Sequence, residues 1–416
     1  MLQKIQSVRG MNDLLPEESG QWEWFEDTVR EVFRQYGYRL IRTPIVEPTG
    51  LFVRSIGEVT DIVEKEMYSF EDELNGDQLT LRPEGTAGIV RSAIENGWLY
   101  NNPQRVWTVG PMFRHERPAK GRYRQFHQFD VEALGFEGPD VDAEQIMMLS
   151  RVWKQLGISS AHLEINSIGD AAERKAHREK LISYFEANQE LLDEEARRRL
   201  YSNPLRILDT KNPTMQDLVN AAPKLVDLLG ETSLTHFEGL QRLLSAGGLT
   251  FTINPRLVRG MDYYNRSVFE WISSALGGPL TIAGGGRYDG LFEQLGGKFT
   301  PACGFGLGNE RAMLLLQAQN PLASTMILDA YIVHADAQLF ATQVAELLRD
   351  GGKYVTCHAG GGSFKSQMKK ADASGARYAL IIGTQEVSKG GVTLKSLRSE
   401  QNQQFIALAD LVNAMV

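Results

Sequence analysis

The sequence predicts an α/β protein in which a large α+β domain precedes a smaller α/β domain. Within residues 106–135, two segments whose side chains alternate in character flank a loop, which is typical of two antiparallel strands. Strand character stops near residue 171 and returns at residue 249, and the residues between are strongly charged and helical in pattern. From residue 330 onward, strand and helix patterns alternate, as they do in small parallel or mixed α/β domains.

These patterns also predict the domain boundaries. We expect one domain over residues 1–325 and a second over residues 326–416, with a linker at 322–325. A helical insertion at about 171–248 is expected to separate two parts of one sheet. Its charged runs are expected to be solvent-exposed helix faces, because no catalytic combination of side chains stands out among them.

Composition and charge narrow the class of protein. The chain has 416 residues, 42% hydrophobic and 23% charged, as in a globular protein of two or three domains. Its net charge of −8 argues against indiscriminate nucleic-acid binding but leaves room for local basic patches. Cys303 and Cys357 form no CxxC motif, which excludes a cysteine zinc cluster and gives no support for a disulfide framework. Residues 1–18 lack the apolar core of a signal peptide, and no run reaches the roughly 20 apolar residues of a membrane span. We therefore expect a cytoplasmic protein without a membrane partner.

The N-terminal region is expected to begin with an amphipathic helix. Apolar residues recur at three- and four-residue steps within residues 17–36, and Gly37 follows as a stop signal. A strand and turn are expected over residues 38–48, where Pro44 and Pro48 cannot donate hydrogen bonds to a sheet.

Residues 79–86, with the sequence LTLRPEGT, lead into a helical pattern at 87–94. Thr86 is a candidate N-terminal cap of that helix, since threonine often caps helices. Glu84 and Thr86 are also candidates for binding an ammonium group, which needs polar partners when it is removed from water. The two roles are compatible.

Residues 106–135 carry the clearest candidate site. One face of these two strands holds an arginine, three carboxylates, an amide and an aromatic ring, which is poor core material and suits a binding site. These residues are Arg114 and Glu116 on the outgoing strand and Phe126, Gln128, Asp130 and Glu132 on the return strand. The opposite face of the return strand is mostly apolar and is expected to contact the core.

The connection between these strands, residues 117–125, is longer than an ordinary hairpin loop. Its cations are Arg117, Lys120, Arg122 and Arg124. Long loops in compact domains are usually functional or disordered. This stretch alone fits both a solvated basic loop and a functional one.

Further elements are expected along the rest of the chain. In the large domain they are a helix at 142–156, strands at 162–168, 249–254, 267–271 and 303–308, and a helix at 309–319. In the small domain they are strands at 330–334, 354–357 and 378–383 and helices at 339–350 and 364–375. Asn309 is the expected N-terminal cap of its helix, which places Arg311 in the first turn, where the helix dipole also favours a phosphate. The GxxxxGK[ST] motif of P-loop proteins is absent.

Several segments resemble the histidyl-tRNA synthetases, a family of class II aminoacyl-tRNA synthetases. The sequence FRHE followed by the basic loop resembles motif 2 of that class, GYRLIRTPIVEP resembles motif 1, and CGFGLGNER resembles motif 3. LRPEGT resembles the family's amino-acid-binding signature. LVRGMDYYN at 257–265 and AGGGRYDGL at 283–291 resemble the two peptides that set histidyl-tRNA synthetases apart from other class II enzymes. A chance match of two such long and unusual peptides is improbable.

The resemblance implies a fold and a reaction. The fold would be the class II antiparallel sheet flanked by helices, with a helical insertion and a C-terminal anticodon-binding domain. Histidine and ATP, the latter with Mg²⁺, would give histidyl-adenylate and pyrophosphate, and the histidyl group would pass to the 3′ end of tRNA(His). A homodimer through motif 1 is implied, with no tightly bound prosthetic group, and we assign no protein ligand to Mg²⁺.

The resemblance also implies roles by motif position. The expected ATP-binding residues are Arg114 on the α-phosphate, Arg311 on the γ-phosphate, Glu116 on the adenine amino group and Phe126 stacked on the ring. The expected histidine-binding residues are Glu84, Thr86, Gln128, Glu132, Arg259, Tyr263, Tyr264 and Tyr288. Arg259 and Arg114 would be the catalytic residues, Glu132 and Tyr264 would contact the imidazole, and Tyr288 would close the site. Arg117, Lys120, Arg122 and Arg124 would approach the acceptor end of the tRNA, where Ala119 replaces the longer polar residue of some relatives.

Two alternatives stay open. The synthetase-like regulatory subunit of ATP phosphoribosyltransferase binds histidine without aminoacylation, but such proteins generally lack the C-terminal domain and part of the arginine set. Here Arg114, Arg259 and Arg311 are all present, and about 90 residues follow the expected linker. The second alternative is a scaffold that has kept the fold and lost the chemistry.

Overall fold

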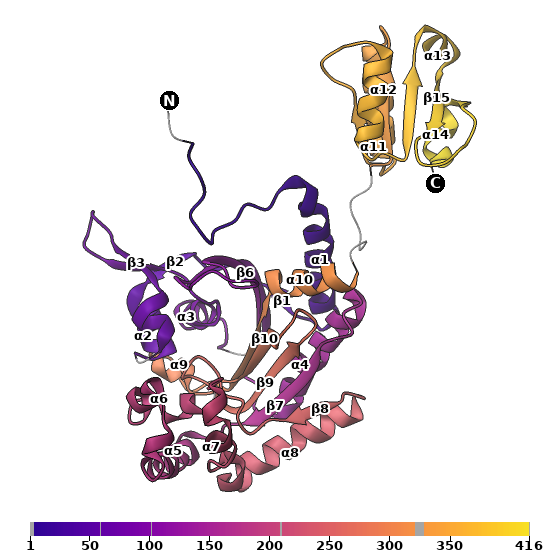
Figure 1. The fold of residues 1–416 in the computed structure, drawn as a ribbon. Helices are drawn as coiled ribbons and strands as arrows, with labels where there is room; N and C mark the ends of the chain where they lie inside the picture. The colour runs from indigo at the N-terminus through magenta and orange to yellow at the C-terminus, as the bar shows by residue number, and fades with distance from the viewer. Residues whose placement is uncertain (1–3, 59, 101, 209, 321–327, 416) are drawn as a thin grey trace. The chain divides into compact units, whose positions relative to one another are not determined.

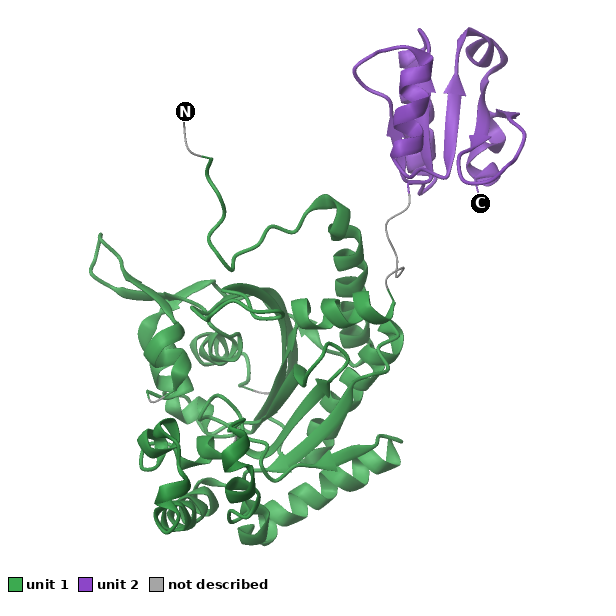
Figure 2. Ribbon diagram, in the orientation of Figure 1, with its two compact units in different colours: residues 1–323 green, residues 324–416 purple. Residues whose placement is uncertain are grey.

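The computed structural model describes residues 4–58, 60–100, 102–208, 210–320 and 328–415. They form two compact units, residues 1–323 and 324–416, which are coloured separately in Figure 2. The expected linker at 322–325 lies outside the described residues. None of the described helices combines the length and the apolar character that a bilayer crossing requires.

The large unit is built on one curved, eight-stranded sheet (Figure 1). In spatial order its strands are β1 (Arg39–Leu40), β5 (Gln104–Phe113), β6 (Gln125–Leu134), β11 (Ala302–Gly308), β10 (Leu280–Arg287), β9 (Asn265–Ser273), β7 (His162–Ser167) and β8 (Phe251–Ile253). Neighbouring strands are antiparallel except at the two edges, where β1 pairs with β5 and β7 with β8 in parallel. The insertion follows β7 and the chain returns in β8, so it does separate two parts of one sheet. The predicted fold class is confirmed.

Helices cover one face of this sheet and form the main core with it. They are α1 (Pro16–Gln35), α4 (Pro139–Leu156), α8 (Glu231–Ala246) and α10 (Asn309–Gln319). The predicted alternation along β6 is confirmed, because Phe129, Val131 and Ala133 are fully buried in that core. The opposite face of β6 is therefore turned toward the concave side of the sheet.

Smaller elements close the concave side. They are α3 (Thr86–Asn96), α2 (Thr49–Ile56), α9 (Leu291–Gln294), the π-helical turn Ile62–Glu66 and a three-stranded sheet of β2 (Val46–Pro48), β4 (Gln78–Leu81) and β3 (Tyr68–Glu71). Figure 1 shows α3 within the curve of the large sheet. Ile89, Val90 and Ala93 of α3 pack in a second apolar cluster with residues of β5 and β6. This helix thereby brings Glu84 and Thr86, at its start, against the sheet.

The insertion contains a core of its own. Its helices are α5 (Ala171–Glu186), α6 (Glu194–Arg199) and α7 (Gln216–Asn220), and its shorter helical turns are Gln189–Leu191, Pro204–Ile207, Pro213–Met215 and Leu225–Leu228. Leu181, Phe185 and Met215 are buried in this separate cluster. The later helix α8 lies within the predicted insertion, but Phe237 and Leu240 of α8 pack in the main core against α4.

The small unit is a mixed five-stranded sheet with helices, as the alternating pattern predicted. Its strands, in spatial order, are β13 (Val355–Cys357), β12 (Ala330–His334), β14 (Tyr378–Ile382), β15 (Gly391–Ser396) and β16 (Gln404–Ala407). Its helices are α11 (Gln338–Asp350), α12 (Phe364–Ala373), α13 (Thr384–Lys389) and α14 (Leu408–Ala414). The first three strands are parallel, and β15 and β16 add antiparallel pairs that the sequence patterns did not reveal.

Two predicted helix caps are wrong. Helix α3 begins at Thr86, and the carboxylate of Glu84 accepts hydrogen bonds from the backbone N–H of Thr86 at 2.8 Å and of Ala87 at 2.9 Å. A carboxylate accepts from two orphan N–H groups at once, so Glu84 performs the capping expected of Thr86. Helix α10 begins at Asn309 with Gly308 as its cap, and neither side-chain polar atom of the buried Asn309 has a partner.

The strand alternation predicted for Arg114 and Glu116 is also wrong, because β5 ends at Phe113. The backbone N–H of Arg114 still bonds to Arg124 at 2.9 Å, but that of His115 turns to the carbonyl of Glu66 at 2.7 Å. The chain leaves the two-stranded ladder there, so periodicity does not fix the direction of either side chain.

The burial of Phe129 predicts a large cost for its truncation. Its ring contacts those of Phe25, Phe33 and Trp107. Phe129→Ala should lower the free energy of unfolding of the large unit by about 3–5 kcal/mol, because it leaves a cavity in the core. All six tryptophans precede residue 272, so denaturation followed by tryptophan fluorescence reports on this unit. Phe299→Ala, at a ring that is 57% exposed, is the matched control and should cost less than about 1 kcal/mol. Equal losses in both variants would contradict the placement of the core.

Candidate active site

A cavity of about 240 Å³ lies on the concave side of the sheet, between β6, β10 and β11 and the loops that follow β5 and β8. Eleven of the predicted site residues line it. They are Glu84, Thr86, Arg114, Glu116, Arg122, Phe126, Gln128, Arg259, Tyr263, Tyr264 and Arg311. The structure therefore brings together residues from five separate stretches of the sequence.

The other predicted residues lie outside the cavity wall. Glu132 and Tyr288 are buried directly behind it, where the hydroxyl of Tyr288 donates to the Glu132 carboxylate. Arg117 and Lys120 are exposed on the basic loop. Arg124 is half-buried, and its Nε donates to the carbonyl of Glu116 at 3.2 Å.

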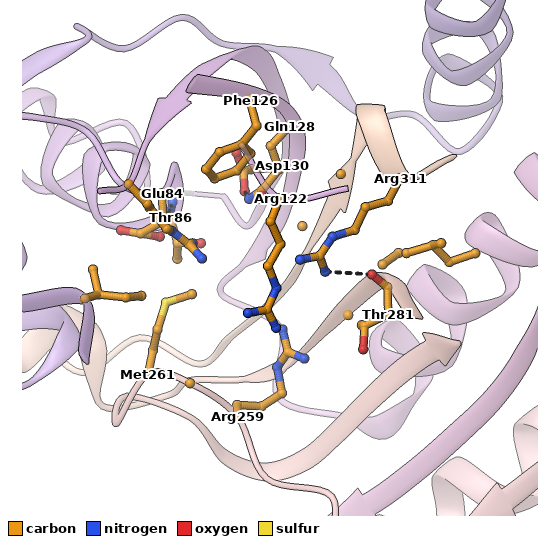
Figure 3. A pocket seen from close by; sticks show the side chains of 18 of the residues that line it. Glu84, Thr86, Arg122, Phe126, Gln128, Asp130, Arg259, Met261, Thr281 and Arg311 are labelled. Atoms are coloured by element: carbon orange, nitrogen blue, oxygen red, sulfur yellow. Dashed lines mark hydrogen bonds between the residues drawn. The ribbon is translucent and has the colours of Figure 1, made fainter. Parts of the chain in front are cut away.

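One end of the cavity is cationic. Figure 3 shows the side chains of Arg122, Arg259 and Arg311 directed toward the middle of the cavity. Arg311, in the first turn of α10, donates from Nε to the carbonyl of Gly121 at 2.9 Å and from Nη1 to that of Thr281 at 2.8 Å. Because carbonyls fix the side chain without neutralising it, burial and then the charges of Arg122 and Arg114 lower the pKa of Arg311. Such a group of guanidinium ions is suited to a multiply charged anion such as a polyphosphate.

Arg114 and Phe126 form a flat surface beside these cations. The Nε of Arg114 donates to the carbonyl of Pro83 at 2.9 Å, and its Cζ lies 5.3 Å from the centroid of the Phe126 ring. The carboxylate of Glu116 lies 3.9 Å from Nη1 of Arg122. An aromatic face next to a hydrogen-bonding carboxylate can stack and orient a nitrogenous base.

Arg259 stands between the two ends of the cavity. Its Nη1 is paired with Glu270 of β9, and its Cζ lies 5.6 Å from the ring centroid of Tyr264. Burial would lower the pKa of Arg259, but the charge of Glu270 together with the neighbouring Tyr264 and Tyr263 outweighs burial and raises that pKa. Glu270 also accepts a hydrogen bond from Thr281 at 2.8 Å. Glu270 was not among the residues predicted for the site, although a carboxylate inside the apolar run SVFEW is a signal of a special role.

The other end of the cavity is acidic: the buried carboxyl groups of Glu84 and Asp130 line it, and that of Glu132 lies buried directly behind them. Burial raises the pKa of Glu84, partly opposed by the N–H groups of Ala87 and Thr86. Burial also raises the pKa of Asp130 to about 7, opposed by the hydrogen bond that Gln128 donates. The pKa of Glu132 is raised well above its ordinary range by burial, despite a 2.6 Å hydrogen bond from the Thr86 hydroxyl. Asp130 shares the predicted site face but had been given no role.

Glycines of β11 make room for this acidic end. Gly304 pairs with Glu132 and Gly306 with Asp130 across the two strands. A Cβ at Gly304 would lie 1.6 Å from Oε2 of Glu132, and one at Gly306 would lie 2.6 Å from Nε2 of Gln128. Glycine at these two positions therefore lets the protein's own site residues approach the backbone of β11 closely.

Three tyrosines enclose the acidic end. The ring centroids of Tyr263 and Tyr264 are 4.6 Å apart, and that of Tyr288 is 5.5 Å from Tyr263. All three side chains are almost fully buried. The tyrosine hydroxyls and the carboxylates can form hydrogen bonds with a ligand that carries an ammonium group and several other polar atoms. A ligand with an apolar side chain would leave these hydroxyls and carboxylates without partners.

The Asp130 carboxyl predicts a pH-dependent stability. Its pKa of about 7 in the folded protein lies above the ordinary 3.8, so the folded state keeps a proton that the unfolded state releases. Stability therefore falls as the pH rises from about 4 to about 7. The side chain of Asp130→Asn does not titrate. The unfolding free energy of the variant minus that of the parent protein should therefore increase by about 2–3 kcal/mol between pH 5 and pH 8.

Urea denaturation at pH 5, 6, 7 and 8, followed by tryptophan fluorescence, measures this gain. Asp217→Asn, at an exposed carboxylate of α7, is the control, because a substitution on the surface should change the unfolding free energy by less than about 0.5 kcal/mol. A pH-independent difference for Asp130→Asn would show that this carboxyl is ionised over the whole range.

Comparison with known proteins gives a consistent result. A family model described as Histidyl-tRNA synthetase matches residues 10–311, and one described as Anticodon binding domain matches residues 327–416. The histidine–tRNA ligase of Aromatoleum aromaticum is 59% identical over 100% of this chain and 95% of its own length. That of Dechloromonas aromatica is 59% identical over 100% and 98%.

Solved structures agree. The histidyl-tRNA synthetase of S. aureus has a TM-score of 0.81 and 35% identity, covering 99% of this chain and 100% of its own. A Bacillus halodurans protein described as an ATP phosphoribosyltransferase regulatory subunit/histidyl-tRNA synthetase has a TM-score of 0.66 and 22% identity, covering 92% and 98%. That second likeness shows the fold alone, so the regulatory alternative gains no specific support. The chain belongs to the histidyl-tRNA synthetases, a family of aminoacyl-tRNA ligases, as the sequence analysis predicted.

Proposed function

We propose that this chain activates L-histidine with ATP and transfers it to tRNA(His) in the cavity described above. The observation that carries the proposal is the division of that cavity into a cationic end and an acidic end, with Arg259 between them (Figure 3). Activation joins an amino-acid carboxylate to the α-phosphate of ATP. A site for it must hold a polyphosphate at one end and an ammonium group at the other.

ATP is assigned to the cationic end. Arg311 would contact the γ-phosphate and Arg114 the α-phosphate, while Phe126 stacks on adenine and Glu116 accepts from its amino group. Support comes from the carbonyl contacts that hold Arg311 and Arg114 in place before a ligand arrives. Such preorganisation reduces the cost of orienting charges during the reaction.

Histidine is assigned to the acidic end. Glu84, Thr86 and Gln128 would receive its ammonium and backbone, with Tyr263 beside them. Glu132 and Tyr264 would contact the imidazole nitrogens. The Glu132 carboxylate accepts hydrogen bonds from the hydroxyls of Thr86 and Tyr288. It could accept a hydrogen bond from an imidazole N–H that replaces one of these hydroxyls.

Arg259 would contact both the histidine carboxylate and the α-phosphate. In that position its charge offsets the repulsion between two anions and stabilises the negative charge that develops as the carboxylate attacks. The pairing with Glu270 and the contact with Tyr264 hold the guanidinium at the junction.

Mg²⁺ would enter as part of the ATP complex. Among the residues that the structure describes, no three His, Cys, Asp or Glu side chains meet in a way that could hold a metal ion. Mg²⁺ usually keeps several waters and takes one or two carboxylates plus substrate phosphates. We therefore propose that Mg²⁺ is held mainly by the phosphates of ATP, and we assign no protein ligand to it.

The tRNA would contact two regions. Arg117, Lys120, Arg122 and Arg124 of the basic loop would approach the acceptor end, since Arg122 already lines the cavity. The match of residues 327–416 to an anticodon-binding domain supports contact of the small unit with the anticodon. The cytoplasm is the proposed site of action, where Cys303 and Cys357, which form no disulfide, would stay reduced.

Pyrophosphate exchange into ATP tests the activation step. With each of the twenty amino acids offered separately, exchange should require histidine. Arg259→Ala should reduce it about 100-fold or more, because one charge that stabilises the transition state is lost. Arg242→Ala, at an exposed arginine of α8, should leave the rate unchanged. Histidine binding without any exchange in the parent protein would instead favour the regulatory alternative.

A homodimer through residues 17–48 is also proposed. Leu40, Ile45 and Val46 in this segment are 48%, 41% and 39% exposed, which leaves apolar surface for a second copy to cover. Light scattering at micromolar concentration should give twice the mass of one chain. Ile45→Asp should shift the protein toward the monomer, whereas Leu339→Asp, at another exposed leucine, should not. A monomeric parent protein would refute the dimer.

A further inference from the structure

The loop that carries three of the proposed site residues is irregular. Residues 254–264 run between β8 and β9 as turns and non-repetitive backbone, and they contain Arg259, Tyr263 and Tyr264. Backbone of this kind has no ladder or helical hydrogen bonds of its own to fix its position. Its position must therefore be set by contacts from neighbouring elements.

Two arginines of the insertion supply such contacts. Nη1 of Arg174, in the first turn of α5, donates to the backbone carbonyl of Tyr264 at 2.6 Å. Nη2 of Arg206, in the turn Pro204–Ile207, donates to the backbone carbonyl of Gly260 at 2.6 Å. The first carbonyl belongs to a proposed imidazole-binding residue and the second to the neighbour of Arg259.

Both arginines are anchored to the rest of the insertion. The N-terminus of α5 is tied by Glu173, whose carboxylate accepts from the N–H of Gly230 at 2.6 Å and from the hydroxyl of Ser233 at 2.7 Å. The turn that holds Arg206 contributes Ile207 to the insertion's own core. A fixed insertion can therefore fix the loop.

Apolar packing between the insertion and the loop is incomplete. A cavity of about 300 Å³ lies between them, lined by Arg174, Arg178 and Arg206 on one side and by Val258, Met261 and Asp262 on the other. Across this cavity the loop has no close contacts that would oppose a small displacement, unlike side chains in a packed core. The loop is also held at Arg256, whose Nε donates to the carbonyl of Leu208 at 2.9 Å, and by the packing of Leu257, Tyr263 and Tyr264 in an apolar cluster. At the carbonyls of Gly260 and Tyr264 themselves, the restraint comes from Arg206 and Arg174.

We propose that Arg174 and Arg206 are positioning residues that hold the 254–264 loop in the geometry needed to bind histidine. Each donates a charge-assisted hydrogen bond to the backbone beside a substrate-contacting side chain. The insertion thereby acts as part of the amino-acid site, although neither arginine lines the proposed active-site cavity. This inference rests on the proposed function.

The test compares alanine variants of three arginines in full-length protein. Arg174→Ala and Arg206→Ala should raise the KM for histidine in pyrophosphate exchange about tenfold, since each loses a charge-assisted bond that orders the loop. The KM for ATP should change less than about twofold, because Arg114 and Arg311 lie outside the loop and Arg259 keeps its pairing with Glu270. Arg206→Lys keeps one cationic donor and should recover most of the histidine affinity.

Arg178→Ala is the matched control. Arg178 lies one turn after Arg174 on α5 and lines the same cavity, but it donates to the carbonyl of Tyr201 within the insertion. Its kinetic constants should equal those of the parent protein. If Arg174→Ala and Arg206→Ala resemble Arg178→Ala, or if they raise both KM values equally, the arginines have no positioning role.

Direct histidine binding by calorimetry separates this inference from the proposed function. Arg174→Ala and Arg206→Ala should weaken histidine binding about tenfold even if the parent protein performs no exchange. Absence of exchange would then count against the proposed reaction and not against the positioning role. Should an alanine variant fail to fold, judged by circular dichroism, Arg174→Met and Arg206→Met replace it, because methionine keeps an unbranched side chain and removes the cationic donor. The proposal is supported if Arg174→Ala and Arg206→Ala weaken histidine binding and Arg178→Ala binds histidine as the parent protein does. Unchanged histidine affinity in all three variants overturns it.

Discussion

The structure depends on the burial of opposite charges on one face of β6 and its surroundings. The carboxyl groups of Glu84, Asp130 and Glu132 are buried inside the protein. Backbone carbonyls hold the guanidinium groups of Arg114 and Arg311 in place in the same site. Burying an unpaired charge is costly, so these groups keep their places only because capping N–H groups, hydroxyls and protonation compensate them. A histidine ammonium would replace part of that compensation. The same arrangement that costs stability in the free protein therefore favours binding of a cationic amino group.

The sheet is shaped to allow this burial. The face of β6 that packs against α1 and α4 is filled by Phe129, Val131 and Ala133, which fix the strand firmly. On the other face, glycines of β11 replace side chains, so the Gln128 and Glu132 side chains occupy the space of a missing Cβ. Strand β6 thus contributes side chains to both the core and the site, because successive side chains of a strand point to opposite faces of the sheet.

Much of this organisation was predictable from sequence, and the exceptions have physical causes. The two faces of β6 follow from a period of two, and long helices such as α1 and α4 follow from their apolar spacing. Local capping was not predictable, because Glu84 and Thr86 both carry oxygens that can cap, and only the fold decides between them. The direction of Arg114 depends on a bond from the N–H of His115 to the carbonyl of the distant Glu66, and a single sequence carries little trace of such a long-range contact. Glu270 stands out in the sequence as a carboxylate in an apolar run, but only the fold shows that its partner is Arg259.

The two walls of the proposed histidine site differ in how they are held. Tyr288 follows Arg287, which is fully buried and paired with Asp142 at 2.7 Å and with Asp289 at 3.0 Å. Asp142 is also bonded to His236 of α8 at 2.8 Å. Burial would raise the pKa of Asp142, but the charge of Arg287 and the hydrogen bonds from His236 and Arg287 together outweigh burial and lower that pKa, so the pair stays ionised. A wall fixed by this network of buried ion pairs faces the 254–264 loop, where the carbonyls of Gly260 and Tyr264 each accept a hydrogen bond from one arginine of the insertion. Any adjustment to a bound histidine should therefore occur on the loop side, where the insertion can act on it.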